Sequence, residues 1–174
     1  IHPGEFVLCD QFVDRTRGRV DTFYEGPEVY HVSPAETYCP HLRQLAAEVI
    51  RQHGITVHER GTIVVINGPR FSTKAESRWF SSQGWDVVGM TQYPEAYLAL
   101  EQAMAVVNIA LVTDYDCGLF AEGSVEPVNA TEILRVFQQN AERIRKVVLD
   151  LAARIPLDLD SPSHHVLEHA KISH

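Results

Sequence analysis

Two near-continuous apolar runs, GTIVVI at 61–66 and VVNIALV at 106–112, constrain the fold of this chain more than any other feature. Runs that are apolar on both alternating faces are typical of strands buried on both sides of a sheet. Four segments with helical spacing or helix-start signals are interleaved with such strands: 40–54, 72–84, 94–104 and 131–153. This order predicts an α/β fold with a mixed or largely parallel central β-sheet flanked by helices.

Shorter signals complete this outline of the chain. Strands are predicted at 5–9 and 86–88, and a long polar segment at 10–27 is predicted to be an ordered loop. Thr73 followed by Glu76 has the spacing of a capping box at the start of the second helix. With 174 residues, 45 % of them hydrophobic, the chain is expected to form one domain without repeats.

Charge and composition exclude several classes of protein. A formal charge of −8 argues against a protein that neutralises nucleic-acid phosphates. No apolar run approaches the roughly 18–20 residues needed to cross a bilayer, and no leader pattern opens the chain. Three cysteines without C-x-x-C spacing indicate reduced thiols, and the histidines form no metal pattern. We therefore expect a soluble cytoplasmic protein without metal that binds neither membrane nor nucleic acid.

Two carboxylates, Asp114 and Asp116, directly follow the apolar run at 106–112. Carboxylates in such a place are costly unless they are paired, hydrogen-bonded or solvated in a cleft. Two interpretations stay open from the spacing alone. One is a turn decorated with acidic residues. The other is a pair of acceptors, or a general acid of raised pKa, for a ligand rich in N–H groups such as an aminopurine.

Two further polar segments follow predicted strands. GPRFST at 68–73 combines a glycine, an arginine, an aromatic ring and two hydroxyls, which suits an anion or a stacked base but also an ordinary helix cap. Met90 and Thr91 follow the strand at 86–88, where the hydroxyl suits phosphate or the cap of the next helix. In α/β sheets, ligands bind at the carboxyl ends of strands, where the segments 67–73, 89–91 and 113–116 are all expected.

Taken together, six segments resemble the methylthioadenosine phosphorylase branch of the trimeric purine nucleoside phosphorylase family. They are DQFVDRT (10–16), FYEG (23–26), AETYCP (35–40), NGPRFSTKAES (67–77), DVVGMTQYPEAYLA (86–99) and TDYDC (113–117). The resemblance runs in order across most of the chain. It implies reversible phosphorolysis, in which inorganic phosphate cleaves the glycosidic bond of a purine nucleoside to give a free base and a pentose 1-phosphate. It also implies a homotrimer without metal or organic cofactor, with phosphate as co-substrate.

The resemblance assigns roles to individual residues. Asp114 matches the catalytic position that hydrogen-bonds or protonates the purine imidazole nitrogen, and Tyr115 and Asp116 belong to the same base-binding turn. Met90 matches the residue that lies against the ribose, and Thr91 matches a phosphate-binding hydroxyl. The turn at 113–116 is thus expected to hold the base, and the segment at 90–91 the sugar and phosphate.

Other matched positions concern specificity. Phe71 matches the aromatic residue near the base, and Ser72 stands where members acting on 6-oxopurines carry a glutamate. His31 matches a residue that reaches across the trimer interface to the neighbouring 5′ substituent. Three residues match the aliphatic lining of the 5′-methylthio pocket: Ala130, Ile133 and Leu134. Aspartate at 114 together with Ser72 favours a 6-aminopurine, whereas the stretch 118–127 departs from the family pattern.

The resemblance favours phosphorolysis of 5′-methylthioadenosine to adenine and 5-methylthioribose 1-phosphate, a step of purine and methionine salvage. Two alternatives stay open: a purine nucleoside phosphorylase acting on adenosine or 6-oxopurine nucleosides, and a non-catalytic purine-binding module. The resemblance covers the C-terminal two-thirds of a typical member, so the N-terminal segment that binds most of the phosphate is expected to be missing. Ile1, in place of an initiator methionine, fits a truncated or clipped chain that needs this segment as a partner.

Overall fold

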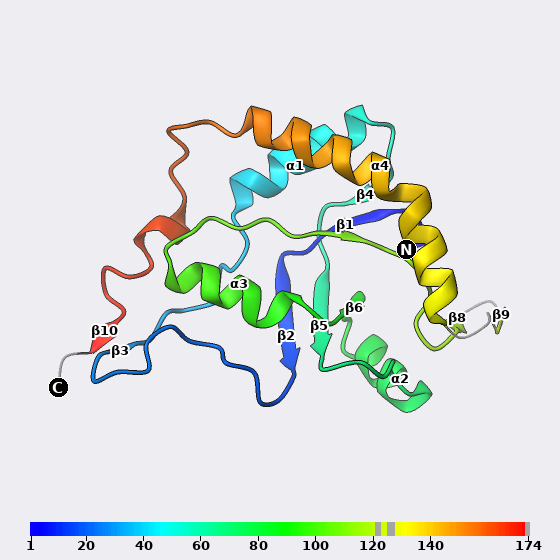
Figure 1. The fold of residues 1–174 in the computed structure, drawn as a ribbon, viewed down its shortest axis with the longest axis horizontal. Helices are drawn as coiled ribbons and strands as arrows, with labels where there is room; N and C mark the ends of the chain where they lie inside the picture. The colour runs from blue at the N-terminus through cyan, green and yellow to red at the C-terminus, as the bar shows by residue number, and fades with distance from the viewer. Residues whose placement is uncertain (121–122, 125–127, 173–174) are drawn as a thin grey trace.

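Strand β1, Phe6–Leu8, lies at the centre of the fold, and its three side chains are buried. The computed structural model describes residues 1–120, 123–124 and 128–172. β1 pairs in parallel with β4, Val57–His58, and antiparallel with β7, Ile109–Leu111 (Figure 1). These pairings confirm the predicted α/β fold with mixed strand directions.

A second sheet follows directly from the first, because the chain passes from β1 through Cys9 and Asp10 into β2, Gln11–Arg15. β2 pairs in parallel with β5, Thr62–Ile66, which pairs in parallel with β6, Val87–Gly89. The prediction of a loop from residue 10 onward was wrong over β2. This strand lies at the edge of its sheet and only its Phe12 and Val13 are partly buried, so it lacks a strong hydrophobic pattern.

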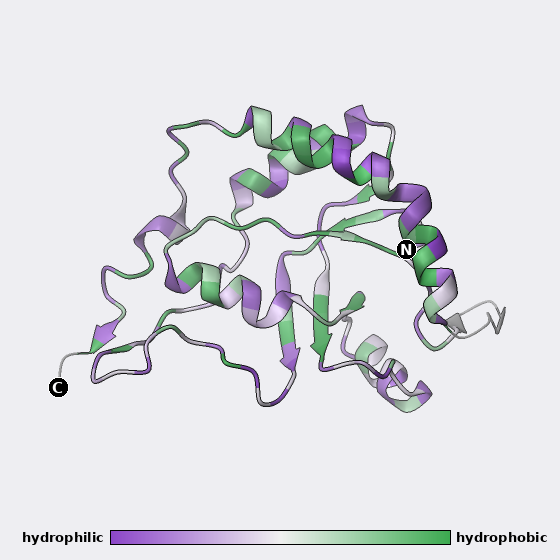
Figure 2. Cartoon of the chain, viewed as in Figure 1, coloured by the Kyte–Doolittle hydropathy of each residue, from purple (hydrophilic) through white to green (hydrophobic). Residues whose placement is uncertain are grey.

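Helices cover both faces of β1. The helices α1, Pro40–Gln52, and α4, Ala130–Arg154, form one core cluster with Phe6 and Leu8. Val7 belongs to a second cluster that includes Ala96 of α3, Gln92–Glu101. Because side chains alternate between the faces of a strand, β1 is enclosed by apolar side chains from both layers. Figure 2 shows hydrophobic residues along β5 and β6, and a mixture of hydrophobic and hydrophilic residues along α4.

The other elements are short. They are α2, Lys74–Ser82; the 3-10 helix η1, Pro162–His165; and the strands β3, Val29–Tyr30, β8, Leu119–Phe120, β9, Gly123–Ser124, and β10, Lys171–Ile172. β3 pairs antiparallel with β10, and β8 pairs antiparallel with β9. The pairing of β3 with β10 attaches the histidine-rich C-terminal stretch to the segment that carries His31.

Two predicted elements have different bounds in the structure. The strand predicted at 106–112 pairs only over β7, because the Val106 carbonyl instead accepts the N–H of Cys39 at 2.8 Å, ahead of α1. In α3, Tyr93 has non-helical angles (φ −111°, ψ 131°), so regular helix begins at Pro94. Proline disfavours helical angles in the residue before it, which accounts for this start. Met104 lies beyond the end of α3.

Residues 16–28 form a loop that is fixed to α3. The Glu101 side chain at the end of α3 is buried and accepts hydrogen bonds from the Thr22 hydroxyl and the Phe23 N–H, each at 2.8 Å. The Tyr24 hydroxyl donates to the Glu101 carbonyl at 3.0 Å, and the Tyr93 hydroxyl donates to Asp21. The later part of the predicted loop is therefore held by specific polar contacts.

The three cysteines, Cys9, Cys39 and Cys117, are free and buried. Burial raises the pKa of the Cys9 thiol to about 12, which keeps it protonated and unreactive at neutral pH. In the part of the chain that the structure describes, no helix has the length and apolar character needed to cross a membrane. No cluster of three His, Cys, Asp or Glu residues within that part is arranged to hold a metal ion.

Candidate active site

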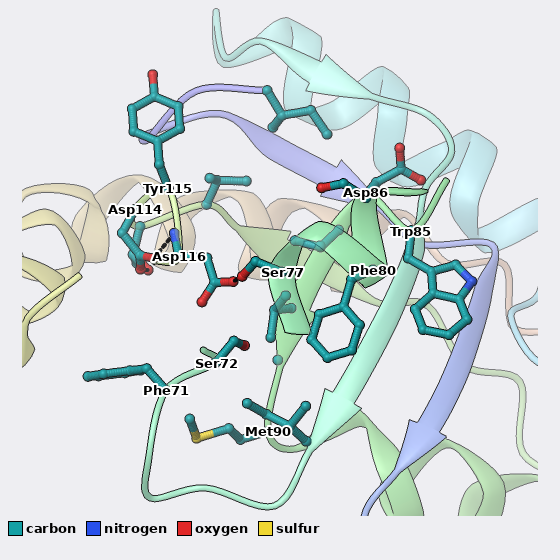
Figure 3. Close-up of a pocket in the computed structure, with 18 of the residues that line it drawn as sticks. Phe71, Ser72, Ser77, Phe80, Trp85, Asp86, Met90, Asp114, Tyr115 and Asp116 are labelled. Atoms are coloured by element: carbon teal, nitrogen blue, oxygen red, sulfur yellow. Dashed lines mark hydrogen bonds between the residues drawn. The ribbon is translucent and has the colours of Figure 1, made fainter. Parts of the chain in front are cut away.

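A cavity of about 350 Å³ lies where β5, β6 and β7 end, and it brings the three predicted polar segments together (Figure 3). Seven of the predicted site residues line it: Phe71, Ser72, Met90, Asp114, Tyr115, Asp116 and Ile133. The topology explains the meeting, because β5 and β6 are parallel and their carboxyl ends open on the same side. β7 brings the 113–116 turn to the cavity from the other sheet.

Asp114 organises the turn that follows β7. One of its carboxylate oxygens accepts the Asp116 N–H at 2.8 Å, and the other accepts the Thr113 hydroxyl at 2.6 Å. Asp116 has a positive φ of 52°, a conformation that aspartate and asparagine tolerate better than most residues. The hydrogen bonds of Asp114 hold this conformation in place, as aspartate side chains commonly do in tight turns.

Asp116 extends from this turn toward α2, where the Ser77 hydroxyl donates to its Oδ2 atom (Figure 3). Among the described residues, no donor reaches the second oxygen of Asp116, so this oxygen is available to a ligand in the cavity. Ser77 was not identified from the sequence, because only the fold brings it to the turn. The available signal was the capping box that fixes where α2 begins and places Ser77 in its first turn.

The hydroxyl of Ser72 is the least satisfied polar group of the site. Ser72 is 8 % exposed, and its Oγ atom has no hydrogen-bond partner among the described residues. A buried polar atom without a partner costs about 1–3 kcal/mol. Because Ser72 lines the cavity, this atom is placed to gain a partner from a bound ligand.

Aromatic side chains form the wall opposite the acidic turn. Figure 3 shows Phe80 and Trp85 on one side of the cavity, with Asp114 and Tyr115 on the other. The Phe80 and Trp85 rings lie 5.8 Å apart between centroids, and Trp79 lies 5.5 Å from Trp85. Phe80 and Trp85 were missed in the sequence because an aromatic residue in a helix or just after it equally fits a core position. The cavity thus combines an apolar wall with carboxylates, which suits a flat heterocycle with N–H groups.

Met90 packs against the glycine that follows β5. Gly68 has a φ of +68°, and a Cβ atom added to it would lie 2.6 Å from the Met90 sulfur. Glycine therefore serves two needs at this position: it permits the left-handed backbone, and it leaves room for the thioether.

A Gly68→Ala variant is expected to displace the Met90 side chain and to lose about 1 kcal/mol of stability through the left-handed backbone. The thioether moves easily because it is flexible, so the larger consequence should be a changed cavity beside Met90. If Met90 lies against a sugar, as the sequence resemblance implies, the affinity for a nucleoside should fall several-fold more than the affinity for its free base, which calorimetry with such a pair measures. Gly84→Ala, at φ +74° with open space around it, is the matched control for backbone strain. Equal loss of both affinities would contradict the prediction.

Helix α2, which carries Ser77, begins at the predicted capping box. The Thr73 hydroxyl accepts the Glu76 N–H at 3.2 Å, and the Glu76 carboxylate accepts the Thr73 N–H at 2.8 Å. The Arg70 guanidinium donates to both carboxylate oxygens of Glu76 at 2.7 and 2.8 Å. The hydrogen bonds from Arg70 are the main cause that lowers the pKa of Glu76 from 4.5 to about 2, and the hydrogen bond from the Thr73 N–H is the second.

A Glu76→Gln variant is expected to lower the free energy of unfolding by about 1 kcal/mol at neutral pH, since the pair is partly exposed. Glu76 has a lower pKa in the folded state, so its contribution is complete above pH 4.5 and is lost as the pH falls through about 2. Urea unfolding across this range should show the two proteins converging in acid. Glu142→Gln, which removes an exposed ion pair on α4, serves as control. If the stability difference between Glu76→Gln and the parent chain did not change with pH, the lowered pKa of Glu76 would not be its cause.

Four predicted residues lie outside the cavity lining. Thr91 is exposed beside Met90 and caps α3 without a side-chain hydrogen bond. His31 is exposed, and its N–H donates to the Ala170 carbonyl at 2.8 Å, away from the cavity. Ala130 and Leu134 are exposed on α4 next to Ile133. In the divergent stretch 118–127, residues 121–122 and 125–127 lie outside the described residues.

Comparisons with known proteins are consistent with this geometry. The family model described as the phosphorylase superfamily matches residues 1–153. The S-methyl-5′-thioadenosine phosphorylase of Thermofilum pendens is 48 % identical over 170 residues, which cover 98 % of this chain and 63 % of that protein. The corresponding enzyme of Pyrococcus abyssi is 50 % identical over 154 residues, covering 88 % and 58 %. The chain thus spans about three-fifths of the length of these relatives.

The solved structures that resemble this chain also include methylthioadenosine phosphorylases. A methylthioadenosine phosphorylase from an antarctic soil metagenomic library has a TM-score of 0.81 and 36 % identity, covering 98 % of this chain and 60 % of that one. The methylthioadenosine phosphorylase of Schistosoma mansoni, solved in complex with adenine, has a TM-score of 0.83 and 35 % identity, covering 90 % and 61 %.

Proposed function

Because the chain belongs to the phosphorylase superfamily, we propose that it is the base- and sugar-binding part of a phosphorylase that acts on 5′-methylthioadenosine. In the proposed reaction, an oxygen of inorganic phosphate bonds to C1′ of the sugar as the bond from C1′ to purine N9 breaks. The electrons of that bond go to the base, which takes up at its imidazole ring the proton that hydrogen phosphate gives up on becoming the sugar phosphate. The products are adenine and 5-methylthioribose 1-phosphate.

The observation that carries this proposal is the pair of carboxylates, Asp114 and Asp116, and the unpartnered Ser72 hydroxyl in a cavity with an aromatic wall. Adenine is flat, donates N–H from its exocyclic amine, and gains a second N–H when its imidazole ring is protonated. The carboxylates of Asp114 and Asp116 suit these donors, and the unpartnered Ser72 hydroxyl suits a ring nitrogen or the amine. Met90 and Thr91 are proposed to meet the sugar and the phosphate.

A second substrate class has support from one relative. The purine nucleoside phosphorylase of Streptomyces coelicolor is 46 % identical over 162 residues, covering 88 % of this chain and 57 % of that protein. Such an activity would release hypoxanthine or guanine from 6-oxopurine nucleosides. The carboxylate of Asp114 weighs against this, since an oxo group offers no hydrogen to a carboxylate.

The proposal extends to the rest of the assembly. Large apolar side chains remain exposed on α4, at Leu134, Phe137, Val148 and Leu149. Large exposed apolar patches, unlike single apolar residues, mark surfaces that other chains cover. Together with the partial coverage of the relatives, they support an N-terminal segment as partner and a homotrimer as the working form. Free buried thiols support a reducing, cytoplasmic setting.

The test is phosphate-dependent release of base by the purified 174-residue chain, with 5′-methylthioadenosine, adenosine and inosine offered in parallel. The proposal expects adenine release from 5′-methylthioadenosine to exceed base release from inosine. A preference for inosine would support the second substrate class instead. Adenine binding without release would indicate a base-binding part that needs its partner segment, and the absence of both would overturn the proposal.

A further inference from the structure

Arg19, in the loop 16–28, lies against the backbone at the edge of the candidate site. Its guanidinium donates to the carbonyl of Met90 at 2.8 Å, to that of Asn67 at 3.3 Å, to that of Ile66 at 3.4 Å, and also to that of Tyr93. One side chain thus contacts the end of β5, the end of β6 and the start of α3. Among the described residues, no carboxylate forms an ion pair with it.

This position is where regular pairing between the strands ends. The ladder between β5 and β6 stops at the pair Val65 and Gly89, so the next residues on each strand have no ladder partner from the other. The Arg19 fork donates to the carbonyls of Ile66 on β5 and Met90 after β6, and so bridges the two segments beyond the last pair of this ladder. A guanidinium has five N–H groups in one plane, so a single group can serve several acceptors from different segments.

The bridged residues carry the sugar side of the site. Arg19 donates to the carbonyl of Met90, and Thr91 is the next residue. Arg19 also donates to the carbonyl of Asn67, which precedes Gly68, the residue against which the Met90 sulfur packs. The acidic turn at 113–116 follows β7 of the other sheet and, among the described residues, shares no hydrogen bond with Arg19. Loss of Arg19 should therefore disturb Met90 and Thr91 while leaving the base-binding turn in place.

From this geometry we infer that Arg19 is a positioning residue, which sets Met90 and Thr91 relative to the base-binding turn. The expected effect on nucleoside binding rests on the proposed function. The expected effect on the position of Met90 does not, because it can be measured without a ligand. Lysine cannot replace the arginine fully, because its ammonium group is a single point that cannot span three segments.

The first experiment reads the position of Met90 without any ligand. The chain has two methionines, Met90 and Met104, so isotope-labelled methionine methyl groups give two resonances. In Arg19→Gln we expect the Met90 resonance to shift or broaden while that of Met104, which is exposed beyond α3, stays in place. Arg17→Gln is the matched control, because the hydrogen bonds of Arg17 to Asn67 use only its backbone. This control should leave both resonances unchanged.

The second experiment separates sugar from base. Calorimetry compares the affinities for 5′-methylthioadenosine and adenine in the parent chain, Arg19→Gln, Arg19→Lys and Arg17→Gln. We expect Arg19→Gln to bind the nucleoside about tenfold more weakly, a loss of the size of one hydrogen bond to a charged group, with adenine affinity unchanged. Arg19→Lys should recover part of the loss. A purely structural role would lower both affinities together.

Each outcome decides the inference. An unmoved Met90 resonance in Arg19→Gln, or equal loss of both affinities, overturns it. If the parent chain binds neither compound, the proposed function fails, and the methionine spectra still decide whether Arg19 positions Met90. If Arg19→Gln does not fold, both methionine resonances collapse, and Arg19→Lys carries the test with the same expected direction and a smaller shift.

Discussion

Replacing Asp114 with asparagine is expected to weaken adenine binding about 10- to 100-fold, because hydrogen bonds to a charged group contribute about 1.5–3 kcal/mol. The turn should survive the change. The amide oxygen of asparagine can still accept the Asp116 N–H, and the Thr113 hydroxyl can accept the amide N–H instead of donating. The substitution therefore removes the charge of Asp114 from the proposed base site while keeping the fold, and it should also improve binding of hypoxanthine.

Calorimetry with adenine and hypoxanthine measures both effects, and urea unfolding confirms that stability is retained. Asp158→Asn, at an exposed position remote from the cavity, is the matched control and should bind adenine like the parent chain. An Asp114→Asn chain that keeps its adenine affinity would remove Asp114 from the proposed role and leave it as a residue that only shapes the turn.

The second large effect is expected at Glu101, which holds the loop 16–28 against α3. A Glu101→Ala variant should lose about 3–5 kcal/mol of unfolding free energy, since two hydrogen bonds to a buried carboxylate disappear and their donors lose their partner. Loss of this size is a large share of the roughly 5–15 kcal/mol that stabilises a typical domain. The freed loop should also be cut faster by trypsin after Arg17 and Arg19.

Urea unfolding and timed trypsin digestion test this expectation. Glu142→Ala is the control, because Glu142 makes an exposed ion pair with Arg145 on α4, and its replacement should leave the urea midpoint close to that of the parent chain. If Glu101→Ala unfolded at the same urea concentration as this control, Glu101 would not be the anchor of the loop.

The strands and helices with strong periodic patterns could be predicted from the sequence. The capping box at Thr73 and Glu76 fixed the start of α2, and the apolar run at 61–66 became β5. β2 could not be predicted, because an edge strand with two half-buried residues resembles a polar loop. The shortened β7 depends on a contact between Cys39 and Val106, which no local pattern encodes.

For the site, the sequence predicted which segments follow strands but not which side chains meet. Met90, Ser72 and Asp116 come together because three strand ends share one cavity. Ser77 and Arg19 act through partners that lie 39 or more positions away along the chain, so no spacing could reveal them. The roles of the individual site residues stay predictions until the variants are measured.

The aromatic wall has a spectroscopic consequence. Trp79 and Trp85 are the chain's two tryptophans, and both lie at the α2 end of the molecule, where Trp85 lines the cavity. Tryptophan emission therefore reports on this end alone, whereas the far-ultraviolet circular dichroism is dominated by α1 and α4. Recording both signals during denaturation shows whether the cavity end melts together with the helical layer or before it, and the emission gives a direct optical signal for any purine that enters.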